Sequence, residues 1–237
     1  MNPEMSTPVS NTELAYERIR NAIIRQELKA GEAISQVKLS EQLGISRTPL
    51  REALRLLERD GLVDAQHNRR VVISKTSVTD MEELYALRLS VESMAIRLAV
   101  PQLTAKDFGR LHRQIADMDR LMRLESVDDW ELVHREFHMT LVRPAGPRIA
   151  SLIEDLSDHA ERYRRSFIAQ GTRGWASSSD EHKVILQAGE KGHVTEASVA
   201  LAKHDARVSL SVFLNQAPDH EPRAVRSALR MVVGDTR

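Results

Sequence analysis

The sequence predicts a mainly α-helical protein in which three helices and a small β-hairpin precede a separate bundle of six helices. Two observations carry this prediction. Only 4% of the 237 residues are aromatic while 41% are hydrophobic, and most apolar residues recur at helical rather than alternating spacing. Strand-like runs occur only between residues 62 and 74, and after Lys75 the pattern is helical throughout.

The N-terminal part, residues 1–76, is expected to be ordered from about residue 11. Glycines at positions suited to helix ends separate its helical segments, and Ser46 is a good N-terminal cap for the third of them. Two short runs of strand-forming residues follow, joined by a turn at residues 66–69. The predicted helices are residues 12–27, 37–43 and 46–60, and the predicted strands are residues 62–65 and 70–74.

The second part, residues 77–216, is predicted to be all-helical. Proline and glycine interrupt its apolar periodicity at several points, which indicates helix ends there. The last segment, residues 217–237, contains Pro218 and Pro222 and is predicted to be a partly disordered or weakly helical tail. The six predicted helices are residues 79–99, 104–124, 128–143, 148–169, 178–191 and 194–216.

Composition excludes several classes of protein. The chain has no cysteine, so it has no disulfide framework, no thiolate nucleophile and no cysteine-ligated zinc. Its apolar runs are far shorter than the ~20 residues that a membrane-spanning helix needs, and its first ten residues lack the apolar core of an export signal. We therefore expect a cytoplasmic protein with no membrane partner.

The first part has the pattern of a winged helix-turn-helix. A short helix, a tight turn at Gly44 and a longer helix that opens with Ser46-Arg47-Thr48-Pro49 precede the hairpin. In such modules the second helix enters the major groove N-terminus first, and the planar donors of arginine match guanine. The sequence therefore predicts that double-stranded DNA is contacted by Ser46, Arg47, Thr48 and Arg51. Four arginines at four-residue spacing are also typical of a solvated face, but together with the turn and the wing they favour DNA binding.

Four histidines of the second part share helix faces with apolar residues. His134 and His138 lie on one stripe with Trp130, while His182 and His204 accompany aliphatic residues on two further helices. One buried histidine is usually explained by a hydrogen bond, since an unpaired buried polar group costs about 1–3 kcal/mol. Four on converging helices favour a metal site instead, and imidazole suits a divalent ion such as zinc, nickel or manganese.

Arg88 stands out on the helix that begins near residue 79. The apolar stripe expected to face the core is Leu84, Leu87, Val91, Met94 and Leu98, and Arg88 lies at its shoulder with Glu92 one turn on. The plainer interpretation is an Arg–Glu pair at i and i+4. The sharper one, which we favour, is a cation that binds the carboxylate of an effector.

The segment LSEQLGISRTPLREALRLLERDGLV resembles the winged helix of the GntR family of bacterial regulators, over residues 12–76. The resemblance implies a homodimer on a pseudo-palindromic operator. It also implies base contacts from Arg47, Thr48 and Arg51, a backbone contact from Ser46, and a contact from His67 near the wing tip. Two departures from the family pattern are Ala30-Gly31 after the first helix and Asn68 at the usual wing glycine.

Residues 79–216 resemble the FCD ligand-binding domain of the FadR-type subfamily. That subfamily carries Asp-x-x-x-His on one helix, a His after Glu on another and a further His one helix later. Here His138, His182 and His204 match, whereas His134 occupies the aspartate position. The resemblance implies a metal site at these four residues, with Arg88 lining the cavity.

Together these patterns predict a ligand-responsive transcriptional regulator, a repressor of a catabolic operon that a small carboxylic acid releases from DNA. An all-histidine site contributes no anion, so a bound dication would attract a carboxylate effector. One alternative is a metal-dependent enzyme acting on small organic acids, since a metal can activate water. A protein with a purely structural metal is the other.

Overall fold

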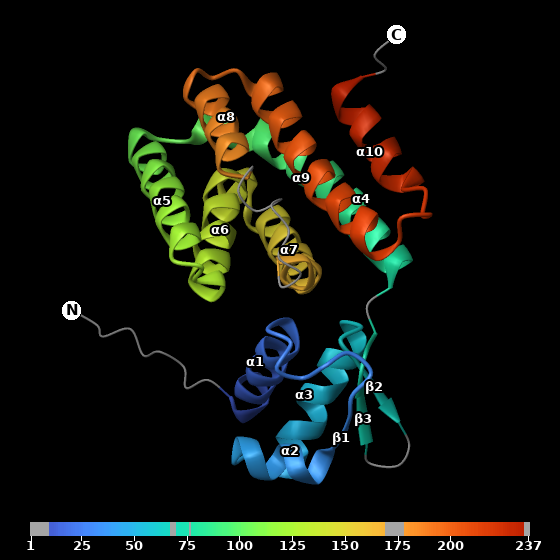
Figure 1. Cartoon of the computed structure of the whole chain (residues 1–237). Helices are drawn as coiled ribbons and strands as arrows, with labels where there is room; N and C mark the ends of the chain where they lie inside the picture. Colours follow the sequence, from blue (N-terminus) through green and yellow to red (C-terminus); the bar gives the residue numbers. More distant parts are fainter. Residues whose placement is uncertain (1–9, 67–69, 76, 169–177, 235–237) are drawn as a thin grey trace, which may run out of the picture. The chain divides into compact units, whose positions relative to one another are not determined.

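The computed structural model describes residues 10–66, 70–75, 77–168 and 178–234. The chain forms two compact units, residues 1–76 and 77–237 (Figure 1). Among the described helices, none is long and apolar enough to cross a membrane.

The first unit packs three helices against a small sheet. Its apolar core joins α1 and α3 to the strands through Ile19, Ile23, Leu54, Val71 and Ile73. The elements are α1 Asn11–Ile24, β1 Ala33–Ser35, α2 Gln36–Leu43, α3 Arg47–Arg59, β2 Val63–Gln66 and β3 Arg70–Ile73.

The sheet has three antiparallel strands in the order β1-β3-β2, one more than the sequence predicted. The additional strand, β1, is only three residues long, and Ile34 is its one buried residue. A strand this short is below the four to eight residues over which alternation can be recognised. It forms because β3 offers a free edge, where Ile34 pairs with Val71.

The turn between α2 and α3 follows from one glycine. Gly44 has a φ of 64°, the left-handed conformation that ends a helix and that glycine adopts without strain. The next residue, Ile45, is buried, and its carbonyl oxygen accepts a hydrogen bond from Ser40 Oγ at 2.6 Å. This fixes the start of α3, for which Ser46 is the N-terminal cap residue.

The second unit is a helical bundle. Helix α4 packs against α7, α9 and α10, while α5 packs against α6 and α8, and α8 against α9 (Figure 1). The helices are α4 Val78–Ala99, α5 Ala105–Arg123, α6 Val127–Val142, α7 Pro147–Ile168, α8 Ser178–Glu190, α9 Val194–Gln216 and α10 Arg223–Val233.

The prediction of a disordered or weakly helical tail after residue 216 was wrong. Residues 223–233 form α10, which buries Val225 and Ala228 against α4 and α9. Glu82 of α4 anchors its start, since one carboxylate oxygen accepts the Ala224 N–H at 2.5 Å and the other lies 2.6 Å from His220 Nε2. The prolines that suggested disorder lie before the helix, and Pro222 precedes its first residue.

The predicted core face of α4 was wrong in part, since Leu84 is buried and Val91 packs against the core, but the other three residues are not buried. Leu87, Met94 and Leu98 are about half exposed, at 54%, 46% and 47%. The face that is buried instead carries Tyr85, Arg88, Leu89, Glu92 and Ile96. Because two of these residues are charged, a count of apolar residues favoured a neighbouring side of the helix.

Candidate functional site

Helix α3 has an apolar side that is buried and, at its N-terminus, a polar side that is exposed. Leu50, Leu54 and Leu57 are buried in the first unit, so the opposite side of the helix faces solvent. All four residues predicted there to contact DNA are exposed, namely Ser46, Arg47, Thr48 and Arg51. The fifth predicted contact, His67, lies outside the described residues.

The arginines of α3 divide into two classes. Arg55 forms an ion pair with Glu52 at 2.9 Å, and Arg59 forms one with Asp60 at 3.3 Å. Arg47 and Arg51, at the start of the helix, make no ion pair within the described part of the chain. Their guanidinium groups are therefore available to an external acceptor at the end of the helix that would enter a DNA groove.

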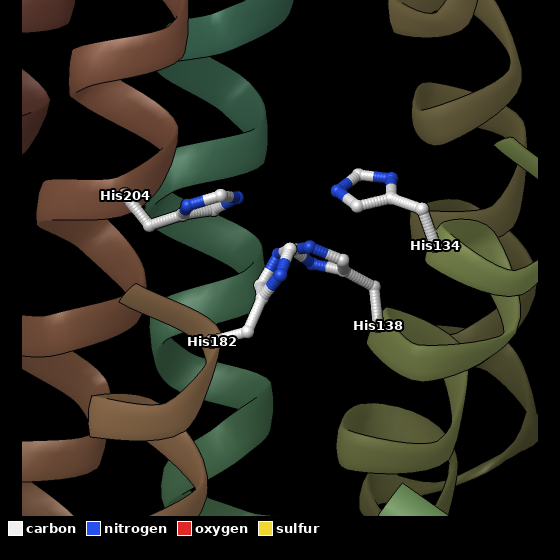
Figure 2. Close-up of side chains that lie close together, drawn as sticks. All are labelled: His134, His138, His182 and His204. Carbon is white, nitrogen blue, oxygen red and sulfur yellow. The ribbon is translucent and has the colours of Figure 1, made fainter. Parts of the chain in front are cut away.

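The four histidines come together in the second unit. Figure 2 shows His134 and His138 extending from α6 toward His182 of α8 and His204 of α9. One ring nitrogen of each lies within 4.8 Å of the others. All four side chains are buried, and none is more than 4% exposed. The helical spacing therefore predicted a real cluster.

Carboxylates orient two of the four imidazoles. Glu181 Oε2 lies 2.8 Å from Nδ1 of His204, and Glu92 Oε2 lies 3.4 Å from Nδ1 of His138. A carboxylate that accepts the Nδ1–H of a histidine fixes the tautomer and leaves Nε2 with a free lone pair. This is the usual arrangement around a metal-binding histidine.

Several nitrogens of the cluster are buried without a hydrogen-bond partner among the described residues. They are Nδ1 of His134, Nε2 of His138 and both ring nitrogens of His182. Buried polar atoms in folded proteins nearly always have a partner. Nitrogens gathered within 4.8 Å of one another fit a divalent cation, which would satisfy them together.

The electrostatics of the cluster favour neutral rings. Burial lowers the pKa of His138 to about 4, even though the hydrogen bond to Glu92 opposes the shift. Burial and neighbouring positive charges lower the pKa of His134 and His182 well below 6.5, and burial lowers that of His204. Metals bind neutral imidazole, so these shifts keep the ligands competent near neutral pH.

Arg88 is not at a shoulder of the helix but buried at 2% exposure. Its Nε donates to Glu92 Oε1 at 2.7 Å, and its Nη2 donates to Asp205 Oδ1 at 3.4 Å. Although burial alone would raise the pKa of Glu92, the charge of Arg88 and the hydrogen bond from His138 lower it to about 2. The structure thus contains the Arg–Glu pair of the plainer interpretation, and contact with an effector stays a prediction.

Trp130, which the sequence places on the same helix stripe as His134, stacks on that histidine with ring centroids 4.5 Å apart. Other residues around the cluster carried no sequence signal. Asp205 and the buried pair of Arg164 with Glu131 were not found. Arg164 and Glu131 are 33 residues apart on different helices, and no local pattern relates them.

Two family profiles match the chain. The first, described as "Bacterial regulatory proteins, gntR family", matches residues 11–73. The second, described as "FCD domain", matches residues 83–207, more than half of the chain. The chain belongs to the GntR family and carries an FCD domain. It is a transcriptional regulator of the GntR/FCD type, with a winged helix-turn-helix as its DNA-binding unit.

Individual relatives agree with this assignment. The HTH-type transcriptional regulator YdhC of Bacillus subtilis is 29% identical over 146 residues, which cover 60% of this chain but only 65% of YdhC. The HTH-type transcriptional repressor GlaR of Escherichia coli is 25% identical over 203 residues, covering 82% of this chain and 87% of GlaR. These relatives are regulators rather than enzymes, so they do not support the metalloenzyme alternative.

A solved structure shares the fold. The E. coli protein McbR/YncC matches with a TM-score of 0.78 at 20% identity, covering 86% of this chain and 98% of that protein. At this identity the match supports the winged unit and the helical unit as a fold, and nothing more specific.

Proposed function

We propose that this GntR/FCD regulator is a repressor of a catabolic operon and that a small carboxylic acid, bound at a metal in the FCD domain, releases it from its operator. The observation that carries the proposal is the cluster of four buried histidines, whose unpartnered nitrogens converge in the domain attached to the winged helix. The description of GlaR as a repressor supports the direction of control.

The divalent metal would be held by His134, His138, His182 and His204, and zinc, nickel and manganese all accept imidazole ligands. When bound, the metal would supply a Lewis-acidic positive charge that attracts a carboxylate. The chain's own contribution is to orient two ligands through Glu92 and Glu181 and to exclude water, since all four rings are buried. Arg88 would add a second positive charge beside the effector.

The DNA partner would be a pseudo-palindromic operator, which a homodimer reads through two copies of α3. Arg47, Thr48 and Arg51 would contact bases, Ser46 the backbone, and His67 the groove near the wing. Two-fold operators need two recognition helices spaced by about one turn of the DNA helix.

The second copy of the chain would bind to a half-exposed apolar row on α4. This row consists of Leu87, Met94 and Leu98. Exposed apolar side chains that share one surface mark protein interfaces.

The first experiment measures metal content and operator binding on the same purified sample. We expect a bound divalent metal by elemental analysis, and its loss in His182→Leu but not in the control His193→Gln, whose side chain is exposed. Wild-type protein free of metal after purification without chelators would contradict the metal site.

The second experiment titrates the operator complex with acetate, lactate, pyruvate, succinate and citrate. At least one acid should weaken DNA binding, and chelation of the metal should abolish that effect. Coupling between two sites is typically 1–3 kcal/mol, so the shift should be about 5- to 150-fold. If all five acids leave the operator complex unchanged, the proposed effector class is wrong.

The proposed dimer surface is tested separately by sedimentation. It should give a dimer for the wild-type protein and a monomer for Leu98→Glu.

A further inference from the structure

One side of α4 is open to solvent although it carries apolar side chains. Leu87 and Met94 on this side are 54% and 46% exposed. Glu83, Ser90 and Arg97 join them at spacings of four, three, four and three residues, which places all five along one face of a helix. Glu83 and Arg97 are exposed, and Ser90 is partly exposed. These five residues form a stripe, the α4 stripe, that the rest of the described chain leaves largely uncovered.

Helix α10 packs along α4 and makes the α4 stripe one wall of a groove. The groove has two hollows, and Ser90 and Met231 line both of them. One hollow, of about 480 Å³, extends to Glu83, and the other, of about 370 Å³, extends to Arg97. A cavity of about 150 Å³ already accommodates a ligand the size of benzene. Each hollow is therefore large enough for an aliphatic side chain of another molecule.

The two ends of the α4 stripe carry opposite charges. Within the described residues neither Glu83 nor Arg97 forms an ion pair. Arg97 Nε donates to Ser198 Oγ at 2.9 Å, which holds the guanidinium group in place and leaves its two terminal nitrogens for an external carboxylate. At the centre, Ser90 Oγ donates to the carbonyl oxygen of Ala86 at 2.9 Å. The hydroxyl group at the centre of the stripe is therefore already paired, so burying it there leaves no donor unsatisfied.

The α4 stripe is complementary to a second copy of itself. Glu83 and Arg97 each lie seven residues from Ser90, or about 10 Å along the helix axis. In an antiparallel pair of α4 helices whose two-fold axis passes Ser90, Glu83 of each copy lies opposite Arg97 of the partner subunit. A parallel pair would place like charges opposite each other, which is disfavoured. The same two-fold axis brings Leu87 of each copy to the hollow beside the partner's Arg97 and Met94 to the hollow beside the partner's Glu83.

We propose that a second copy of this chain docks in the groove between α4 and α10 with the two α4 stripes antiparallel. Two Glu83–Arg97 ion pairs then join the copies, and Leu87 and Met94 occupy the hollows. This inference rests on the proposed function, which places the second copy on α4. It adds the relative direction of the two helices, the charged residues that select this direction, and a part for α10. Helix α10 follows the residues 83–207 that match the FCD profile, so the surface contains an element outside that profile.

The test measures dimerisation of the full-length protein by sedimentation over a range of protein concentrations. Glu83→Arg and Arg97→Glu each place like charges opposite each other at both ends of the paired stripes. Because both residues are exposed, the variants should fold, and the dissociation constant of their dimers should rise by about tenfold or more. A one-to-one mixture of the two variants restores opposite charges at both ends, so it should form a mixed dimer with an affinity close to that of the wild type.

Two further variants test the charges and α10 separately. Lys191→Glu makes the same change of charge as Arg97→Glu at an exposed residue just after α8, so its dimer should be as tight as that of the wild type. Met231→Glu puts a carboxylate where the two hollows meet and should weaken the dimer, because α10 lines the interface. Higher salt should reduce the effect of the charge reversals, since salt screens exposed charges.

Recovery of the dimer in the mixture would support the inference, and a misfolded variant could not give it. If Leu98→Glu produces monomers while each charge reversal dimerises like the wild type, or if the mixture stays monomeric, the antiparallel arrangement is wrong and the proposed function stands. An unchanged dimer in Met231→Glu would overturn the part assigned to α10. If the histidine site holds no metal but the mixture of variants forms the dimer, the metal part of the proposed function fails and this inference stands.

Discussion

The stability of the metal-free protein should fall steeply as the pH drops below 6.5. In an unfolded chain a histidine has a pKa of about 6.5. In the folded protein burial lowers the pKa of His138 to about 4 and lowers those of His134, His182 and His204 as well. Below 6.5 the unfolded state therefore binds more protons than the folded state, so acid favours unfolding.

The size of the effect follows from these pKa values. The contribution is fully present above pH 6.5 and is lost as the pH falls toward the folded pKa. For His138, the difference between 6.5 and about 4 corresponds to roughly 3 kcal/mol. Each histidine that stays neutral adds a slope of up to about 1.4 kcal/mol per pH unit. Four such histidines give a slope of up to about 5.4 kcal/mol per pH unit, so a domain at the lower end of the usual range, with a stability of about 5 kcal/mol, should unfold at about pH 5.5.

The assay is urea unfolding of the chelator-treated protein at several pH values between 7.5 and 5, followed by circular dichroism. The slope of the unfolding free energy against pH gives the number of protons taken up. His182→Leu should reduce that uptake by about one proton, and the exposed His193→Gln should leave it unchanged. A flat profile between pH 6.5 and 5 in the metal-free wild type would refute the account of buried neutral imidazoles.

Three further predictions concern single residues. Arg51→Ala should weaken operator binding by roughly 1–3 kcal/mol in an anisotropy titration, whereas Arg55→Ala, which removes the partner of Glu52, should weaken it less. Equal effects would contradict the division of the α3 arginines into ion-paired and DNA-contacting residues. Gly44→Ala should lower the melting temperature of the first unit because a φ of 64° costs a non-glycine residue about 1–2 kcal/mol. An unchanged melting temperature would show that the turn can adapt. Glu181→Gln should weaken zinc binding by about 10- to 100-fold because it alters the partner of His204. An unaltered affinity for zinc would show that Glu181 does not belong to the site.

Helix positions and the histidine cluster could be predicted from the sequence because both depend on local spacing. Helices α4 to α9 begin and end within a few residues of the positions that capping residues, prolines and glycines indicated. His134 and His138 are one turn apart on one helix, and His182 and His204 each accompany apolar neighbours. These relations need no knowledge of which helices pack together.

The features that failed depend on partners distant in sequence. Strand β1 exists because β3 pairs with it, and α10 is held by Glu82, which lies more than 130 residues earlier in the chain. The buried face of α4 was misassigned because α9 and α6 supply partners for its charges: Asp205 of α9 accepts from Arg88, and His138 of α6 contacts Glu92. Apolar periodicity records which residues avoid water, but it does not show where paired charges are buried.

The misassigned face of α4 has a physical meaning of its own, because its buried Glu92 contacts His138 of the histidine cluster. Sequences usually agree with their fold at every level, and departures from that agreement mark functional sites. In the second unit the departures include a buried arginine and glutamate on α4, a second buried pair between α6 and α7, and four buried histidines. An apolar interior would have been simpler to stabilise, since replacing buried ion pairs by well-packed apolar residues is often neutral or favourable. The retention of so many buried polar groups around the histidines therefore argues for a bound, charged ligand there, which would supply the partners that the chain itself leaves out.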